Sequence, residues 1–275
     1  MITHFNTILG YPSNGDKTQW KPFREMAKNF FTPMRKEYNE WLSELGYPEI
    51  QGNRCIPDSP YLNIYGYPEE LDYTDISQYP EKWFGIDSFM RKGEEEFELP
   101  QSFFKNENNN DSEKLIYLSL GSMGSIDVEL MKRLVAILAK SPHKFIVSKG
   151  PFHEKYELAD NMWGQRSVPQ TKVLPLVDLV ITHGGNNTVT ETFSFGKPMI
   201  VMPLFADQFD NAQRIHEKGF GIRLDGYNCT ESELLNAIEK LLNDKELKER
   251  LTVASNRILN SKSLTKAAEL IEKLV

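Results

Sequence analysis

Apolar residues change their spacing along the chain, and this change separates two regions. From Leu115 onward, short continuous apolar runs alternate with amphipathic stretches. Continuous runs are typical of parallel strands that are covered on both faces, and the stretches between them are typical of helices. Strands are predicted over 115–120, 144–148, 164–168, 179–182, 199–202 and 221–224. This alternation predicts a doubly wound, Rossmann-like domain with a parallel six-stranded sheet.

Polar residues mark where the helices of this region begin and end. Asp127 can cap the helix after the first strand, and Thr230 with Glu233 forms a capping box at a later one. Other helices are expected to start near Asn187, Phe209 and Lys245. A final helix over 263–275 has no strand after it, which leaves it available to pack back on the first domain.

The region before Leu115 follows a different pattern. Apolar residues recur at steps of three and four from Lys21 to Leu45, which predicts a helix that Pro33 breaks or kinks. Short strands are expected over 61–65 and 83–86. Residues 1–20 have no strong period and are a poor match for the start of a domain. We therefore expect a partial α/β domain over 1–95.

A charged, asparagine-rich segment over 91–114 separates the two regions. We place a linker at 96–113, so that the second domain covers 114–262. The glutamates of this segment suggest a metal site, but a solvated acidic run is the simpler interpretation.

Charge and cysteine content restrict the partners and the compartment. The net charge is −7 and the pI is about 5.4, which argues against nucleic acid. Cys55 and Cys229 lie far apart outside any CxxC motif, as expected for reduced thiols in the cytoplasm. No apolar run suits a transmembrane helix, and the first residues lack the regions of a signal peptide. The Asn-x-Ser/Thr triplets at Asn110, Asn186 and Asn228 are then chance matches.

Four loops follow strands of the predicted sheet and so converge on one edge of it. They contain Gly121-Ser122, Val168 to Gln170, His183 to Gly185, and Pro203 to Gln208. A strand, a glycine turn and a helix start present unpaired N–H groups, which bind phosphate. The sequence has neither GxGxxG nor GxxxxGK[ST], which disfavours NAD and excludes a Walker-type ATP site.

The segment HGGNNTVTETFSFGKPMIVMPLFADQFDNA, with VPQ and LSLGSMGS before it, resembles the donor-binding domain of the UDP-glycosyltransferases. The resemblance is close over 115–224 and extends in helix pattern to Val275. It implies the GT-B fold, in which two Rossmann-like domains face each other. It also implies a UDP-sugar as co-substrate, no metal or other cofactor, and no membrane anchor of the vertebrate kind.

The resemblance further assigns roles to residues of the four loops. His183 with Gly184 and Gly185 would contact the donor diphosphate, together with Asn187, Thr188, Gly121 and Ser122. Glu191 would accept hydrogen bonds from both ribose hydroxyls, a task that suits a carboxylate. Val168 and Gln170 would border the base and ribose, and Asp207 and Gln208 would contact the transferred sugar. His183 as a core histidine, or Glu191 as a solvent-facing residue, are the structural alternatives.

Two positions depart from the family pattern. Many members stack a tryptophan on uracil where this chain has Ser167. Backbone groups or another side chain, for which Trp163 is a guess, must then hold the uracil.

The family's general base is a histidine after the first strand of the first domain. None of His4, His143, His153, His183 and His216 has that setting. No catalytic residue is therefore identified, and the chain is expected to be an N-terminally truncated member.

The resulting expectation is an inverting transfer of a hexose to a hydroxyl of a small lipophilic acceptor, by a chain that lacks the base. The resemblance favours glucose as that hexose. The first alternative is a non-catalytic UDP-sugar-binding protein or a pseudoenzyme subunit. A nucleotide-dependent oxidoreductase is the weaker alternative, because the dinucleotide motif is missing.

Overall fold

A computed structural model describes residues 20–50, 58–75, 79–90, 97–100, 103 and 113–274, with side chains on the first helix at 29 and from 31 onward. Several expectations lie outside the described residues. They concern residues 1–19, most of the linker at 96–113 with its acidic run, His4, Cys55 and Asn110. The domain limits drawn from the sequence therefore stay a prediction.

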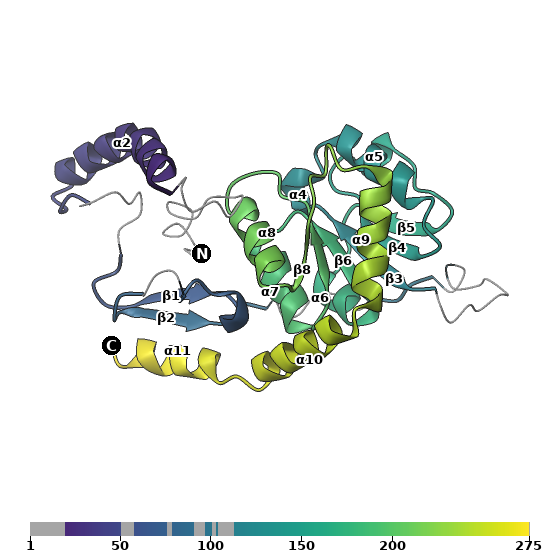
Figure 1. The fold of residues 1–275 in the computed structure, drawn as a ribbon. Helices are drawn as coiled ribbons and strands as arrows, with labels where there is room; N and C mark the ends of the chain where they lie inside the picture. Colours follow the sequence, from purple (N-terminus) through teal and green to yellow (C-terminus); the bar gives the residue numbers. More distant parts are fainter. Residues whose placement is uncertain are drawn as a thin grey trace. The chain divides into compact units, whose positions relative to one another are not determined.

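The chain forms two compact units, which we call the smaller and the larger unit. The larger unit comprises Pro68–Leu71 and Asp87–Ser261. The smaller unit contains the described residues up to Tyr67, Asp72–Ile86, and the chain from Lys262 onward. Figure 1 labels the elements of both units.

The larger unit is built on one six-stranded parallel sheet, in the order β5-β4-β3-β6-β7-β8. In chain order this is 3-2-1-4-5-6, the doubly wound order of the Rossmann fold, with its switch point between β3 and β6. The predicted fold class is confirmed. The strands are β3 (Leu115–Ser119), β4 (Lys144–Ser148), β5 (Met162–Gln165), β6 (Leu179–Thr182), β7 (Met199–Val201) and β8 (Gly221–Arg223).

The strands form where the sequence has continuous apolar runs, because both faces of the sheet are covered. All four residues of β6 are buried, and Ile116, Phe145 and Ile200 are fully inaccessible. The third strand is the exception. It lies at 162–165 instead of the predicted 164–168, since Met162 pairs with Phe145 on β4 and Gly164 approaches the backbone of Val147. Pairing with the neighbouring strand, more than apolar content, sets the limits of this edge strand.

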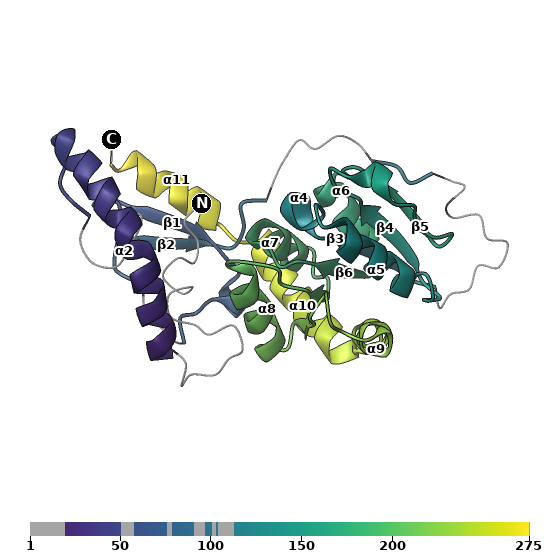
Figure 2. The ribbon, with the colours of Figure 1, turned by 90° about the horizontal axis from the view of Figure 1, so that it is seen from above.

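Helices cover both faces of this sheet. The chain winds in opposite directions from β3 and β6, so right-handed crossovers place α5 and α7 on opposite faces. Helix α9 contacts α5 as well as β6 and β7, whereas α7 contacts α8 and α10; Figure 2 shows the elements from above. The helices are α4 (Gly121–Gly124), α5 (Val128–Leu138), α6 (Gln170–Val173), α7 (Asn186–Ser194), α8 (Gln208–Glu217), α9 (Glu231–Asn243) and α10 (Lys245–Leu259), with 3-10 turns η3 (His153–Lys155) and η4 (Leu174–Leu176).

The helix starts agree with the predicted capping residues. Asp127 accepts a hydrogen bond from the Leu130 amide, and Thr230 and Glu233 form the complete capping box. The short helix α4 lies where the sequence predicted a loop with Gly121 and Ser122. It places the chain after β3 in one helical turn rather than in an open loop.

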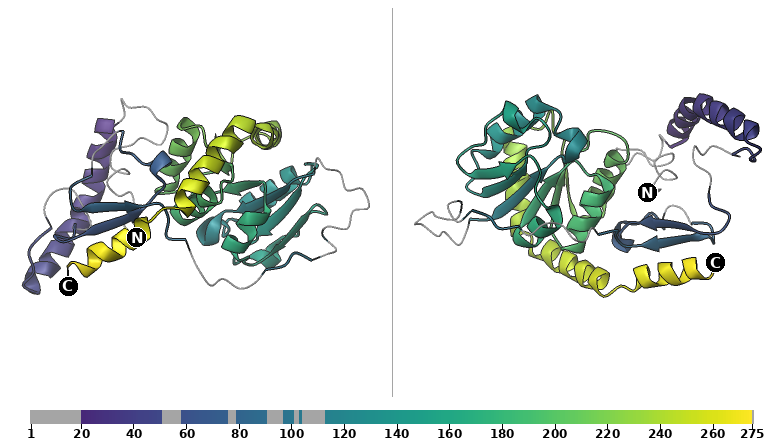
Figure 3. Two further views of the ribbon diagram at one scale, coloured as in Figure 1. Left: turned by 90° about the horizontal axis from the view of Figure 1, so that it is seen from below. Right: turned by 180° about the vertical axis from the view of Figure 1, so that it is seen from behind.

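The smaller unit contains α2 (Trp20–Glu44), the parallel strands β1 (Asn63–Gly66) and β2 (Trp83–Ile86), and α11 (Ser263–Glu272). Helix α2 does not end at Pro33, so the expected break is wrong. Helix α11 packs against β2, and Figure 3 shows it beside the two strands. The turn η2 (Glu69–Leu71) lies between the two strands in sequence but belongs to the larger unit.

Candidate functional site

The candidate site lies where β3 and β6 end, at the switch point of the larger sheet. Ser119, the last residue of β3, pairs with Thr182, the last residue of β6. Gly121 therefore follows one strand beside the His183-Gly184-Gly185 turn that follows the other. Loops at a switch point diverge to opposite faces of a sheet, which leaves a crevice for a ligand.

The imidazole of His183 lies between two glycines. A Cβ at Gly121 would lie 2.7 Å from Cε1 of His183, and a Cβ at Gly185 would lie 2.5 Å from its Nε2. Gly121 also has a φ of +69°, which favours glycine. The sequence places these three residues in two separate loops, and the structure brings them into one contact.

His183 is held in its neutral form. Burial lowers its pKa to about 4, against the opposing effect of a hydrogen bond with the backbone of Ser119. Its Nδ1 lies 3.3 Å from Oγ1 of Thr182. A neutral imidazole carries one N–H donor, and here the hydrogen bond with the Ser119 backbone engages it.

Helix α7 begins beside this histidine. Gly185 is the N-cap residue and provides no side-chain cap, and the helix runs for nine residues from Asn186. The N–H groups of the first helical turn have no partner within a helix, which makes this end suited to an anion. Asn187 is exposed at this end, whereas Thr188 is buried. The helix thus begins at Asn186, one residue before the expected start.

Gln170 and Glu191 form a hydrogen-bonded pair. Nε2 of Gln170 donates to Oε2 of Glu191 at 2.6 Å, and the hydroxyl of Thr188 donates to Oε1 of Gln170 at 3.4 Å. Glu191 is 1% exposed, which rules out a solvent-facing position in this structure. The hydroxyl of Thr188, a residue that the resemblance assigns to the phosphate, contacts Gln170. Val168, two residues before Gln170, is buried. Ser122 is exposed on α4.

The loop between β7 and α8 is fixed by Gln208. Its Oε1 accepts from the amides of Leu204 at 2.9 Å and Phe205 at 3.1 Å, and the residue is only 3% exposed. Ala206 has a φ of +53°, a conformation that non-glycine residues rarely adopt. The side chain of Gln208 thus positions the loop, a task that the sequence interpretation did not include.

Asn211 is a residue of this site that the sequence interpretation missed. Its Nδ2 donates to the carbonyl of Gly184 at 2.8 Å and lies 3.3 Å from Oδ2 of Asp207. It therefore joins the glycine turn to the start of α8. The available signal was its spacing of four residues from Asp207, which places both on one helix face.

Two carboxyl groups at the start of α8 have raised pKa values. Burial raises the pKa of Asp207, opposed by hydrogen bonds that include those from the Asn211 side chain and the Asn186 backbone. Burial and the neighbouring charge of Asp207 raise the pKa of Asp210 to about 8, although Arg223 lowers it. Asp210 is therefore largely protonated near neutral pH.

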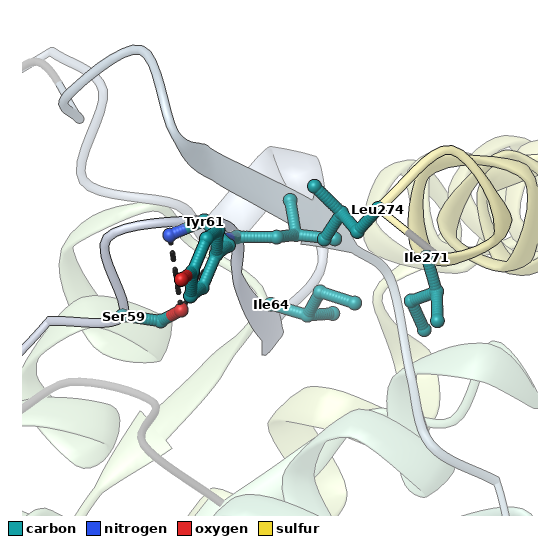
Figure 4. A pocket seen from close by; sticks show the side chains of 6 residues that line it. Ser59, Tyr61, Ile64, Ile271 and Leu274 are labelled. Atoms are coloured by element: carbon teal, nitrogen blue, oxygen red, sulfur yellow. Dashed lines mark hydrogen bonds between the residues drawn. The ribbon is translucent and has the colours of Figure 1, made fainter.

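Other features of the described residues bear less on this chemistry. A hollow of about 490 Å³ in the smaller unit is lined by Ser59, Tyr61, Leu62, Ile64, Ile271 and Leu274. Figure 4 shows its mainly apolar side chains. The described part of the chain holds no group of three His, Cys, Asp or Glu side chains suited to a metal, and no helix there is long and apolar enough to cross a membrane.

Trp163, the residue suggested for the base in place of the missing tryptophan, lies within β5, where its ring packs at 5.6 Å from that of Phe97. Ser167 is exposed in the loop that follows β5. The ring of Trp163 is thus already engaged in a packing contact four positions before Ser167.

The fold is that of solved GT-B glycosyltransferases. The glycotransferase of kitacinnamycin has a similar structure, with a TM-score of 0.77 at 23% identity over 96% of this chain and 68% of that one. The rhamnosyltransferase SpnG complexed with thymidine diphosphate has a TM-score of 0.59 at 23% identity, over 74% of this chain and 54% of that one.

The chain belongs to the UDP-glycosyltransferase family, since the family described as "UDP-glucoronosyl and UDP-glucosyl transferase" matches residues 89–261. Human UDP-glucuronosyltransferase 1A6 is 30% identical over 83% of this chain. A sterol 3-beta-glucosyltransferase of Vanderwaltozyma polyspora is 27% identical over 88% of it. The chain spans only 44% and 21% of these two relatives, respectively.

Proposed function

We propose that the larger unit binds a UDP-sugar at the carboxyl ends of β3, β6 and β7. The observation that carries this proposal is the position of the His183 ring between Gly121 and Gly185, beside the N-terminus of α7. A neutral histidine, glycines that allow close approach, and the N–H groups of a helix start form one anion site.

We assign each part of the donor to a part of this site. The diphosphate lies at Gly185 and Asn187, beside the ring of His183. A helix N-terminus contributes about 0.3–2 kcal/mol of attraction for such an anion. Glu191, positioned by Gln170, accepts from the ribose hydroxyls. The base lies near the backbone of Val168, and Asp207 faces the transferred sugar.

The reaction we propose is transfer of a hexose to a hydroxyl of a small lipophilic acceptor, with inversion and with UDP as leaving group. The acceptor oxygen attacks the anomeric carbon, the bond to the diphosphate oxygen breaks, and the acceptor proton passes to a base. The α7 N-terminus and His183 stabilise the charge that develops on the departing diphosphate. The family resemblance assigns no metal to this step, and the cytoplasmic setting stays a prediction.

A non-catalytic UDP-sugar-binding protein is the second candidate, and the described histidines favour it. His143 pairs with Glu239 at 2.9 Å, but it precedes β4 and so lies at the opposite edge of the sheet. His216, on the last turn of α8, accepts a hydrogen bond from the amide of Arg223 on β8, and His183 belongs to the anion site. His153 lies in η3, which follows the carboxyl end of β4, and lines a separate hollow with Lys149 and Glu157. The low pKa of His183 disfavours it as a base.

Calorimetry with UDP and UDP-glucose, followed by a turnover assay with a phenolic acceptor, separates the two candidates. Binding with turnover supports the transferase, and binding without turnover supports the binding protein. Absence of binding for both ligands would contradict the donor site itself. NAD(H) serves as the negative control, because the oxidoreductase alternative requires it to bind.

A further inference from the structure

The carboxylate of Asp207 lies at the N-terminus of α7, although Asp207 itself is the residue before α8. It accepts hydrogen bonds from the backbone N–H of Asn186, the first residue of α7, and from its own N–H. The side-chain amide of Asn211 donates to its Oδ2 at 3.3 Å. An N–H group that has no partner within α7 is thus bonded to an acidic side chain from the loop after β7.

The glycine turn before α7 packs closely against the start of α8, and this packing keeps the carboxylate in place. The Asn211 amide also donates to the carbonyl of Gly184 at 2.8 Å. A Cβ at Gly184 would lie 3.3 Å from the carbonyl oxygen of Gln208, which opens α8. Two loops of the proposed donor site are therefore joined here, and Asp207 lies at their junction.

The charge of Asp207 has no cationic partner within the described part of the chain. The groups there that lower its pKa are the N–H and amide donors named above, and none of them is charged. The next carboxyl group, that of Asp210, is largely protonated near neutral pH, because burial and the charge of Asp207 raise its pKa to about 8. The pair therefore carries one negative charge, and that charge is on Asp207.

A UDP-sugar and free UDP differ in the charge that they bring to this residue. In a UDP-sugar each phosphate is linked on both sides and carries one negative charge. Departure of the sugar leaves UDP with a terminal β-phosphate, which takes up most of a second charge above its second pKa of about 6. Since Asp207 faces the transferred sugar in the proposed function, the β-phosphate is the phosphate that lies nearer to it.

We propose that Asp207 makes this site select a UDP-sugar over free UDP. The carboxylate shares the N-terminus of α7 with the diphosphate and repels the additional charge of a terminal β-phosphate, because like charges repel strongly where water is partly excluded. A bound sugar covers that phosphate and offers a hydroxyl to the carboxylate. This inference rests on the proposed function. Its consequence is weaker binding of the product UDP, and thus less product inhibition, than the diphosphate contacts alone would give.

The test is calorimetry of the full chain with UDP, UDP-glucose and UMP at about pH 7.5, above the second pKa of a terminal phosphate. Asp207→Asn keeps the shape of the side chain and an acceptor oxygen but removes the charge. We expect it to bind UDP about fivefold more tightly than the wild type, a difference of roughly 1 kcal/mol. It should bind UDP-glucose no more tightly, because it also loses the charged acceptor for the sugar hydroxyl. UMP, which has no β-phosphate, should change by less than about twofold.

Asp225→Asn is the matched control. Asp225 is also a loop carboxylate that accepts from backbone N–H groups, at 2.9 Å from Tyr227 and 3.2 Å from Asn228, and from the Asn228 side chain at 2.9 Å. It follows β8 at the same edge of the sheet, and its substitution removes the same charge from the chain. UDP affinity of this variant should stay within about twofold of the wild type.

The direction of the UDP effect separates this role of Asp207 from its other possible roles. A residue that merely stabilises the start of α7 would make Asp207→Asn bind UDP more weakly. A residue that only contacts the sugar would leave UDP affinity unchanged and weaken UDP-glucose. Either result would overturn the proposal. Asp207→Ser, whose hydroxyl can still accept from the Asn186 N–H, is the second variant and should show the same gain for UDP.

Failure of the donor site gives a different result. If neither UDP nor UDP-glucose binds to the wild type, to Asp207→Asn or to Asp207→Ser, the proposed function itself is contradicted and this inference with it. If the wild type binds both ligands and the two Asp207 variants gain no affinity for UDP, the donor site stands and only the role of Asp207 is refuted.

Discussion

The side-chain amide of Gln170 donates to the carboxylate of Glu191 at 2.6 Å, across 21 residues of sequence. Gln170 lies at the start of α6, after β5, and Glu191 lies in the middle of α7, after β6. One side of the candidate donor site is therefore linked to the other through a buried hydrogen bond. We proposed that this carboxylate accepts hydrogen bonds from the ribose hydroxyls.

Glu191→Ala should remove the discrimination between UDP and its 2′,3′-dideoxy analogue. The wild type should bind UDP at least tenfold more tightly, because a hydrogen bond to a charged group is worth about 1.5–3 kcal/mol. Gln170→Ala should reduce this ratio partly, since it frees Glu191 to move. Calorimetry with both ligands gives the ratio, and Glu129→Ala on the exposed start of α5 is the control. An unchanged ratio in Glu191→Ala would remove this residue from the ribose site.

Gly121→Ala should lower UDP affinity by at least tenfold, because the added Cβ would displace the His183 ring. Gly46→Ala is the matched control. Gly46 has a φ of +76°, similar to the +69° of Gly121, but a Cβ there meets nothing within 4 Å. Both variants carry the backbone cost of a left-handed alanine, roughly 1 kcal/mol. Equal UDP binding by both would show that the contact with His183 is irrelevant.

As the pH rises, the larger unit of Asp210→Asn should lose less stability than that of the wild type. The folded-state pKa of Asp210 is raised to about 8, above its ordinary value of 3.8. The unfolded chain therefore releases the proton first, and the wild type loses stability from about pH 4 up to pH 8. Urea midpoints at pH 5 and pH 8 measure this loss. We expect it to be smaller in Asp210→Asn, and an identical loss in both proteins would contradict the assignment.

Arg257→Met should destabilise the larger unit by about 1–3 kcal/mol. Nε of Arg257 donates to Glu70 at 2.7 Å, and Nη2 donates to Glu70 and to Asp87 at 2.6 Å each. These bonds attach the turn η2 to α10. Lys132→Met, which breaks an exposed pair with Glu129, should change stability by less than about 0.5 kcal/mol. Urea denaturation of the two variants compares the networks directly, and equal midpoints would refute the difference.

The fold was predictable from the sequence because its strands are buried on both faces. β4 and β6 have the predicted limits, because strands covered on both faces have short continuous apolar runs. β5 was misplaced by two residues because its pairing with β4, and not its composition, decides where it starts. Of the break or kink expected at Pro33, the break is wrong, because the helix continues through the proline.

The candidate site was predictable only in part. The position of each loop follows from the strand that precedes it. The sequence therefore predicted that His183 and Gly121 lie at the same edge of the sheet. The contact between them depends on the left-handed turn of Gly121, which spacing does not determine. The use of Gln208 to hold Leu204 and Phe205, and of Asn211 to hold Gly184, likewise depends on loop conformation.

The most direct test of the donor site is the UDP affinity of His183→Ala beside that of the wild type, measured by calorimetry at pH 7. At that pH His183 is neutral, because burial lowers its pKa to about 4. We predict that the variant keeps its fold, as shown by an unchanged far-UV circular dichroism spectrum, and loses UDP binding by a hundredfold or more. A folded His183→Ala protein that binds UDP as tightly as the wild type would contradict the diphosphate site.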